Sequence, residues 1–160
     1  MATRARPLYI FDIDGTLCNI EHRLHFLNSK DPDRWDKFYK ACLYDTPNKP
    51  VLGTMKILCD AGNDIWLFSG RSEDVREETM MWLHTHCWNL AFQLELNPER
   101  LTMRPSKSYT EDHLLKEQWL HSMLDVDRKR LVAVFDDRKR VVDMWRANGV
   151  ACFQVAPGEF

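Results

Sequence analysis

Two aspartates, Asp12 and Asp14, stand one residue apart directly after a short apolar run, in the stretch "FDIDGT". Carboxylates this close repel each other unless a cation or a chemical role stabilises them. Asp12 can attack phosphorus and form an aspartyl-phosphate, while Asp14 can protonate the departing oxygen and later deprotonate water. Gly15 permits a sharp turn, and Thr16 can fix that turn by hydrogen bonding. A bare D-x-D is weak evidence, but D-x-D-G-T after an apolar strand predicts a phosphoryl-transfer site.

Other apolar runs also end in polar residues. Ser69 and Arg71 close the run "LFSGR", and Asp136 and Asp137 close "VFDDR". Since parallel strands end at one edge of a sheet, we expect these groups to gather there, with Ser69, Arg71 and a lysine holding a phosphoryl group. Clustered carboxylates require a cation, and oxygen ligands without a His or Cys set favour Mg²⁺. The predicted metal ligands are Asp12, Asp14, Asp136 and Asp137.

Short apolar runs alternate with longer amphipathic stretches, which predicts an α/β fold with a parallel sheet flanked by helices. The expected strands are "PLYIFD", "DIWLFSG", "LTMR", "RLVAVFDD" and "VACFQVA". The expected helices span residues 49–61, 72–87, 111–124 and 138–148.

One segment, residues 19–48, breaks this alternation. It contains no strand candidate, only the helical stretches "EHRLHFL" and "DPDRWDKFYKAC", the second with Asp31 or Asp33 as its cap. We interpret it as a small helical cap inserted after the first strand of a single domain covering residues 1–160. Its aromatic residues Trp35, Phe38 and Tyr39 are interpreted as core.

The composition narrows the function classes. The 160 residues include 22 Lys and Arg against 24 Asp and Glu, a net charge of −2, so no broad nucleic-acid footprint is expected. The five cysteines contain no C-x-x-C pair, which fits reduced thiols in a cytoplasm. The N-terminal apolar run is too short for a signal peptide or a membrane span. We therefore expect a soluble, cytoplasmic protein without a membrane partner.

The order of these motifs resembles that of the haloacid-dehalogenase-like (HAD) phosphatases, which have a Rossmann-like parallel sheet. The resemblance makes Asp12 the nucleophile, Asp14 the acid/base and Ser69 a phosphate ligand. Lys116 matches the lysine of the third motif, and "DD" at Asp136 and Asp137 matches the metal-binding acids. It implies catalytic roles for Asp12, Asp14, Ser69, Arg71 and Lys116, with Mg²⁺ as the cofactor.

The sequence more closely resembles the 3'-phosphatase domain of bacteriophage polynucleotide kinase-phosphatase. "SGRSE", "DHLLK" and "DDR" match its later motifs, and Arg23, eleven residues after Asp12, matches an arginine near the first. The resemblance implies substrate contacts from Arg23, Ser69, Arg71 and Lys116, supported by Asp112 and Thr16. It also implies 3'-phosphorylated DNA or RNA ends as substrates, a phage-encoded repair role, and functional association with a ligase or a separate kinase. No G-x-x-x-x-G-K-[ST] loop occurs, so the 5'-kinase activity is not carried over.

Several alternatives stay open. The same acids would serve a phosphatase of free nucleotides or other small phosphomonoesters. A non-catalytic module binding phosphorylated ends is a third hypothesis, although such a binder has no need of the Asp12 nucleophile. Ser69 could instead be a helix N-cap, and Arg71 could pair with Glu73 or Glu77. The sequence leaves open DNA against RNA, 2',3'-cyclic phosphates, the oligomeric state, and which of Asp136 and Asp137 contacts the metal directly.

Overall fold

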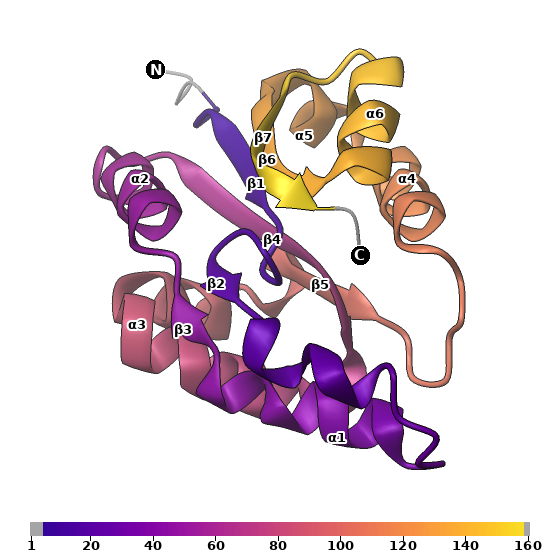
Figure 1. Cartoon of the computed structure of the whole chain (residues 1–160). Helices are drawn as coiled ribbons and strands as arrows, with labels where there is room; N and C mark the ends of the chain where they lie inside the picture. The colour runs from indigo at the N-terminus through magenta and orange to yellow at the C-terminus, as the bar shows by residue number, and fades with distance from the viewer. Residues whose placement is uncertain (1–4, 159–160) are drawn as a thin grey trace.

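Five parallel strands form the central sheet, in the order β5-β4-β1-β6-β7 (Figure 1). The structure is a computed structural model that describes residues 5–158; residues 1–4 and 159–160 lie outside the described residues. The strands are β1 (Leu8–Phe11), β4 (Asp64–Ser72), β5 (Leu101–Arg104), β6 (Leu131–Arg138) and β7 (Cys152–Gly158). The predicted α/β fold with a parallel, HAD-like sheet is confirmed.

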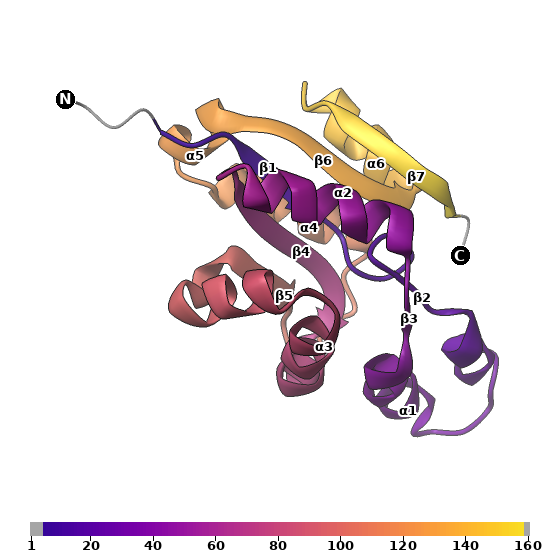
Figure 2. The ribbon, with the colours of Figure 1, turned by 90° about the vertical axis from the view of Figure 1, so that its left-hand side faces the viewer.

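Helices cover both faces of this sheet (Figures 1 and 2). Because strand side chains alternate between faces, Leu8 and Ile10 of β1 belong to one buried cluster and Phe11 to the other. The first cluster also contains Trp145, and the second Met55. The helices are α2 (Lys49–Asp60), α3 (Arg76–Leu96), α4 (Asp112–Ser122), α5 (Asp125–Arg130) and α6 (Lys139–Ala147).

The helices differ from the prediction in two places, one expected helix and one that was not expected. The helix expected over 72–87 begins later, because the 3₁₀ helix η3 (Glu73–Val75) precedes α3, and it continues past Cys87 with a kink there (φ −152°, ψ 60°). A second short 3₁₀ helix, η4 (Pro98–Arg100), leads into β5. Helix α5 was missed because none of its residues is buried, so no apolar periodicity marks it.

The segment after β1 forms the expected cap, with one correction. It begins with β2 (Cys18–Asn19) and returns through β3 (Thr46–Pro47), an antiparallel pair too short to leave a periodic signal. Between them lie η1 (Glu21–Phe26), α1 (Arg34–Lys40) and η2 (Ala41–Tyr44), which project from the end of the sheet (Figure 2).

Within the cap, Asp33 occupies the N-cap position of α1, but its side chain makes no capping hydrogen bond. The Asp31 carboxylate instead accepts a hydrogen bond from the Asp33 N–H at 2.9 Å. Phe38 is buried, as predicted, whereas Trp35 is 44% exposed. The interpretation of Trp35 as core is therefore wrong.

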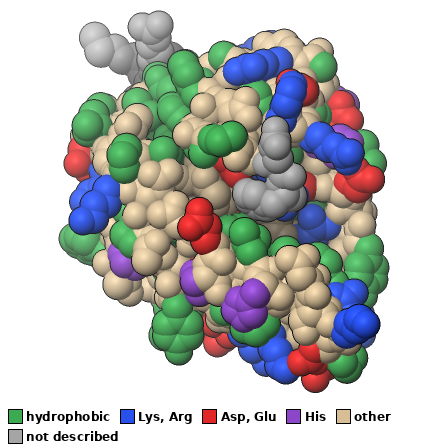
Figure 3. Space-filling model, in the orientation of Figure 1, with side chains coloured by type: hydrophobic (Ala, Val, Ile, Leu, Met, Phe, Trp, Pro, Cys, Tyr) green, Lys and Arg blue, Asp and Glu red, His purple; other side chains and the backbone are tan. Residues whose placement is uncertain are grey.

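The surface agrees with the near-neutral composition. On the face in Figure 3, basic side chains are interspersed with acidic ones and form no continuous patch. All five cysteines are free and buried. Within residues 5–158, no helix combines the length and apolar character that crossing a membrane requires.

Candidate active site

The turn after β1 is shaped by a close approach to Asp137. Gly15 has a φ of +81°, and a Cβ built on it would lie 2.3 Å from Oδ2 of Asp137, so only glycine fits here. The Thr16 hydroxyl lies 3.3 Å from Oδ2 of Asp12 and 3.5 Å from Oδ1 of Asp137, to which it can donate. The turn therefore brings the end of β1 against the end of β6.

We call Asp12, Lys116, Asp136 and Asp137 the nucleophile cluster. Lys116 Nζ donates to Asp12 Oδ1 and to Asp136 Oδ2, both at 2.8 Å. Carboxylate oxygens of the three aspartates lie within 4.8 Å of one another. None of these four residues is more than 5% exposed, so water screens their charges little.

Burial and mutual repulsion perturb every acid in the nucleophile cluster. Burial is the largest cause that raises the pKa of Asp12, and Asp136 and Asp137 raise it further against the charge of Lys116. Burial likewise raises the pKa of Asp136, and burial with the Asp136 charge raises that of Asp137 to about 7. Burial opposes the charge of Lys116, but the surrounding carboxylates raise its pKa well above the ordinary value. The cluster therefore carries an excess of negative charge.

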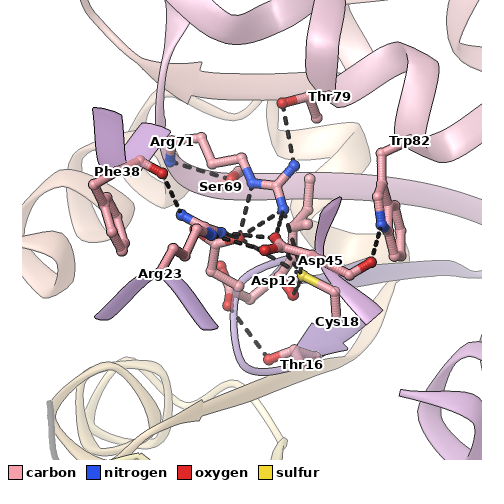
Figure 4. Close-up of polar contacts among 12 residues, drawn as sticks. Asp12, Thr16, Cys18, Arg23, Phe38, Asp45, Ser69, Arg71, Thr79 and Trp82 are labelled. Atoms are coloured by element: carbon pink, nitrogen blue, oxygen red, sulfur yellow. Dashed lines mark hydrogen bonds and ion pairs between the residues drawn. The ribbon is translucent and has the colours of Figure 1, made fainter. Parts of the chain in front are cut away.

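We call Asp14, Arg23, Asp45 and Arg71 the acid cluster. Figure 4 shows Arg23, Asp45 and Arg71 of this cluster side by side. Arg23 Nη2 and Arg71 Nε donate to Asp14 Oδ1 at 2.7 and 2.8 Å. Both arginines also donate to Asp45 Oδ2 at 2.7 Å, and Arg23 Nε donates to Asp45 Oδ1 at 2.8 Å. Burial alone would raise the pKa of Asp14, but the charges of Arg71 and Arg23 outweigh it and lower that pKa.

Asp45 is the site residue that sequence reasoning missed. It follows η2 at the end of the cap, where its backbone carbonyl accepts a hydrogen bond from Trp82 Nε1 at 2.7 Å. Its carboxylate is fully buried and also accepts from His22 at 2.8 Å. No motif surrounds it in "YDTPN", because the cap brings it to Arg23 and Arg71 only after folding. Asp14, Cys18 and Asp45 also have the spacing of metal ligands, but the two guanidinium groups already lie against both carboxylates.

In the structure, the carboxylate of Asp14 is not grouped with those of the other three predicted metal ligands. The acids grouped around Lys116 are Asp12, Asp136 and Asp137, whereas the Asp14 carboxylate is directed to Arg23 and Arg71. The arginines neutralise Asp14 and draw its side chain toward the cap. Three aspartates thus form the group of side chains suited to a cation.

Ser69 lies inside β4, and its fully buried hydroxyl accepts a hydrogen bond from the Arg71 N–H at 3.2 Å. The helix-cap alternative for Ser69 is wrong, since Ser72 accepts from Asp74 N at the start of η3. The pairing of Arg71 with Glu73 is also wrong, because Glu73 pairs with Arg76 at 2.7 Å.

Asp112 links the nucleophile cluster to β5. Its carboxylate lies 3.8 Å from Lys116 Nζ, one helical turn away, and 3.2 Å from Arg104 Nη2. A Cβ at Gly70 would lie 2.4 Å from Asp112 Oδ1, which explains the glycine in "SGR". Arg104 also donates to the Gly70 carbonyl, so it joins two strand ends.

A cleft of about 1030 Å³ opens over these clusters between the cap and the sheet edge. Asp12, Asp14 and Asp112 line it. The residues predicted to bind substrate are at most 1% exposed and lie behind these carboxylates: Arg23, Ser69, Arg71 and Lys116. Their role as phosphate ligands stays a prediction.

Comparisons with known proteins agree with this geometry. A family model described as "Polynucleotide kinase PNKP phosphatase domain" matches residues 6–160. A protein of Autographa californica nuclear polyhedrosis virus, named as a bifunctional polynucleotide kinase/RNA ligase, is 27% identical over 136 residues, covering 84% of this chain and 17% of that protein.

Solved structures show the same fold. A chain of the Pnkp1/Rnl/Hen1 RNA repair complex superposes with a TM-score of 0.69 at 29% identity, over 97% of this chain and 44% of that one. The class C acid phosphatase from Bacillus anthracis, with tungstate bound, has a TM-score of 0.65 at 15% identity, over 99% and 70% of the two chains. This chain spans less than half of the viral protein and of the repair-complex chain. On the family match, the chain belongs to the PNKP phosphatase-domain family of HAD-like proteins.

Proposed function

We propose that the protein is a Mg²⁺-dependent phosphomonoesterase that removes the 3'-phosphate from polynucleotide ends, with Asp12 as the nucleophile. The observation that carries the proposal is the nucleophile cluster, in which Lys116 bridges Asp12 and Asp136 at 2.8 Å at the base of an open cleft. A buried carboxylate that reaches a cleft beside two further acids suits attack on phosphorus better than a structural role.

The nucleophile cluster also fits the metal. Three buried carboxylates with oxygens within 4.8 Å of one another offer hard ligands, and Lys116 leaves part of their charge uncompensated. Asp12, Asp136 and Asp137 would hold Mg²⁺, which would neutralise charge on the phosphate and on these acids.

The reaction follows from the positions of the two catalytic acids. An oxygen of Asp12 forms a bond to phosphorus as the phosphorus–ester oxygen bond breaks, and the departing 3'-oxygen takes a proton from Asp14, which enters this step in its protonated form. Asp14 then removes a proton from water, and the resulting hydroxide attacks the aspartyl-phosphate. Inorganic phosphate leaves and the Asp12 carboxylate is restored.

Arg23 and Arg71 support both of these steps, because they orient the carboxyl group of Asp14. Their hydrogen bonds to Asp14 Oδ1 hold this carboxylate in one orientation and favour its ionised form. The ionised form is the one that accepts a proton from water. Asp45 keeps both guanidinium groups in place behind Asp14.

The substrate assignment rests on the family and on the size of the cleft. A polynucleotide end needs more room than a single phosphate group, and the cleft of about 1030 Å³ lies at the upper end of the usual range for ligand sites. The relatives are named for polynucleotide kinase, RNA ligase and RNA repair. They support an end-repair role beside a ligase, and they favour RNA over DNA ends.

The test compares phosphate release from a 3'-phosphorylated RNA oligonucleotide, its DNA and 5'-phosphorylated counterparts, and free mononucleotides. We expect the 3'-phosphorylated RNA to have the highest kcat/KM, with little turnover of the 5'-phosphate. Preference for free mononucleotides would instead support the alternative of a small-molecule phosphatase.

A further inference from the structure

The cleft has an aromatic wall that the catalytic chemistry does not use. Trp35, Phe38 and Tyr39 of α1 line it together with Asp12 and Asp14. The rings of Trp35 and Tyr39 are stacked, with centroids 6.1 Å apart and planes 29° apart. Phe38 is buried, and the guanidinium group of Arg23 lies over its ring, 4.4 Å from the ring centroid. Helix α1 is thus anchored by Phe38 and presents Trp35 on its outer side.

The exposure of this wall increases from Phe38 through Tyr39 to Trp35. Phe38 is buried and Tyr39 is half-buried, and burial raises the pKa of the Tyr39 phenol. Trp35 is 44% exposed, much more than the 6% of Phe38. Large apolar side chains that stay exposed inside a functional cleft mark a surface for a ligand.

The charges of the cleft decide what kind of contact a nucleic acid can make there. Seven acidic side chains line the cleft against five lysines and arginines. Four of these cations are paired with cleft acids: Lys139 with Asp143 at 2.7 Å, Arg140 with Glu111 at 3.2 Å, and Arg104 and Arg138 with Asp112 at 3.2 and 3.7 Å. A long run of phosphate contacts is therefore disfavoured, whereas stacking of bases on aromatic rings does not depend on net charge.

We propose that Trp35 and Tyr39 form a stacking platform for the last nucleobases of a single-stranded 3' end. The inference rests on the proposed function, because it places the bases next to the phosphate that Asp12 attacks. The loop between β5 and α4 forms another wall of the cleft, with Tyr109 88% exposed beside Lys107. The platform distinguishes a polynucleotide end, which has bases to stack, from a phosphate monoester without them.

The first experiment measures steady-state kinetics of Trp35→Ala on three substrates. They are a 3'-phosphorylated single-stranded oligonucleotide, the same oligonucleotide with abasic 3'-terminal residues, and an aryl phosphate. Loss of one stacking contact should raise the KM of the intact oligonucleotide about 5- to 150-fold relative to the abasic one, with a smaller change in kcat. Trp35→Phe keeps an aromatic ring, so its KM for the intact oligonucleotide should be close to that of the wild type.

Trp88→Ala is the matched control. Trp88 is 65% exposed and lies beside a separate cavity of about 230 Å³ that α2 and α3 line. This variant should leave all three KM values unchanged. Equal increases in KM for the intact and abasic oligonucleotides in Trp35→Ala would overturn the platform.

A binding measurement separates the platform from the proposed reaction. Tryptophan fluorescence of Asp12→Asn protein is followed during titration with a single-stranded oligonucleotide that carries a 3'-phosphate. Stacking should quench the fluorescence, and the quenching should fall in Asp12→Asn with Trp35→Phe. Quenching without 3'-phosphatase activity in the wild type would support the platform and refute the reaction; activity with no Trp35-dependent quenching would refute the platform alone.

Discussion

The two clusters at the base of the cleft differ in their balance of charge. The nucleophile cluster sets three carboxylates, those of Asp12, Asp136 and Asp137, around the single ammonium of Lys116. The acid cluster sets two carboxylates, Asp14 and Asp45, against two guanidinium groups. The nucleophile cluster is buried, and in the acid cluster only Asp14 is partly exposed, so water reduces the difference little.

This difference separates the tasks of the two clusters. The acid cluster is compensated by its own side chains, which orient Asp14 and lower its pKa. The negative charge of the nucleophile cluster is not fully compensated. Burial and the repulsion between its carboxylates raise their pKa values. We therefore propose that a divalent cation and a phosphate bind at the nucleophile cluster and that proton transfer takes place at the acid cluster.

The largest effect is expected from Asp12→Asn. An amide has nearly the same shape but cannot attack phosphorus, so turnover should fall by at least ~10³-fold. The fold should persist, because the change removes one of three mutually repelling charges. Steady-state phosphate release and circular dichroism check both statements. Near wild-type turnover of this variant at saturating Mg²⁺ would exclude Asp12 as the nucleophile.

Removal of the metal should reduce turnover almost as much as Asp12→Asn does. A chelator should abolish activity, Mg²⁺ or Mn²⁺ should restore it, and Asp136→Ala or Asp137→Ala should reduce it sharply, because the remaining acids hold the ion poorly. Asp143→Asn is a suitable control, since Asp143 is a partly exposed acid of α6 paired with Lys139. Full turnover in metal-free buffer would show that the uncompensated acids have another purpose.

A smaller and more selective loss is expected from Asp45→Asn. Without this carboxylate, Arg23 and Arg71 lose the partner that fixes them behind Asp14. Protonation of the leaving oxygen matters more for an alcohol than for an activated phenol. Turnover of a 3'-phosphorylated oligonucleotide should therefore fall about 10- to 100-fold, and that of an aryl phosphate much less.

Asp31→Asn serves as the control for this comparison, because Asp31 is an acid of the cap that pairs with Lys37 away from the acid cluster. An equal fall on both substrates in Asp45→Asn would assign Asp45 to stability alone. A fall confined to the oligonucleotide's KM would assign it to binding.

The smallest effect concerns stability against pH in metal-free buffer. The pKa of Asp137 is about 7 in the folded protein, above its value in the unfolded chain. Between about pH 4 and 7 the folded state therefore binds more protons, and this group makes stability fall as pH rises, by up to about 1.4 kcal/mol per unit. Chemical denaturation should show a shallower fall in Asp137→Asn. An identical pH profile in the two proteins would contradict the repulsion that burial implies.

The sequence predicted the nucleophile cluster better than the acid cluster, for a physical reason. Asp12 directly follows β1, and Asp136 and Asp137 lie near the carboxyl end of β6, so the topology of the parallel sheet brings them together. Asp45 belongs to the cap, where helical turns and two-residue strands carry little periodic signal. The burial of Arg71 behind Asp14 could not be predicted from the sequence either. The direction of a long side chain depends on partners that the local sequence does not reveal.

Thermal unfolding with Mg²⁺ and with a chelator tests the division of labour between the clusters most directly. For a domain of this size, Mg²⁺ at 100-fold excess over its Kd should raise the Tm by about 5–10 °C in the wild type. Asp45→Asn should unfold at a lower temperature but keep the Mg²⁺-dependent increase, whereas Asp137→Asn should lose most of it. An undiminished increase in Asp137→Asn, or none in the wild type, would contradict the assignment of the metal to the nucleophile cluster.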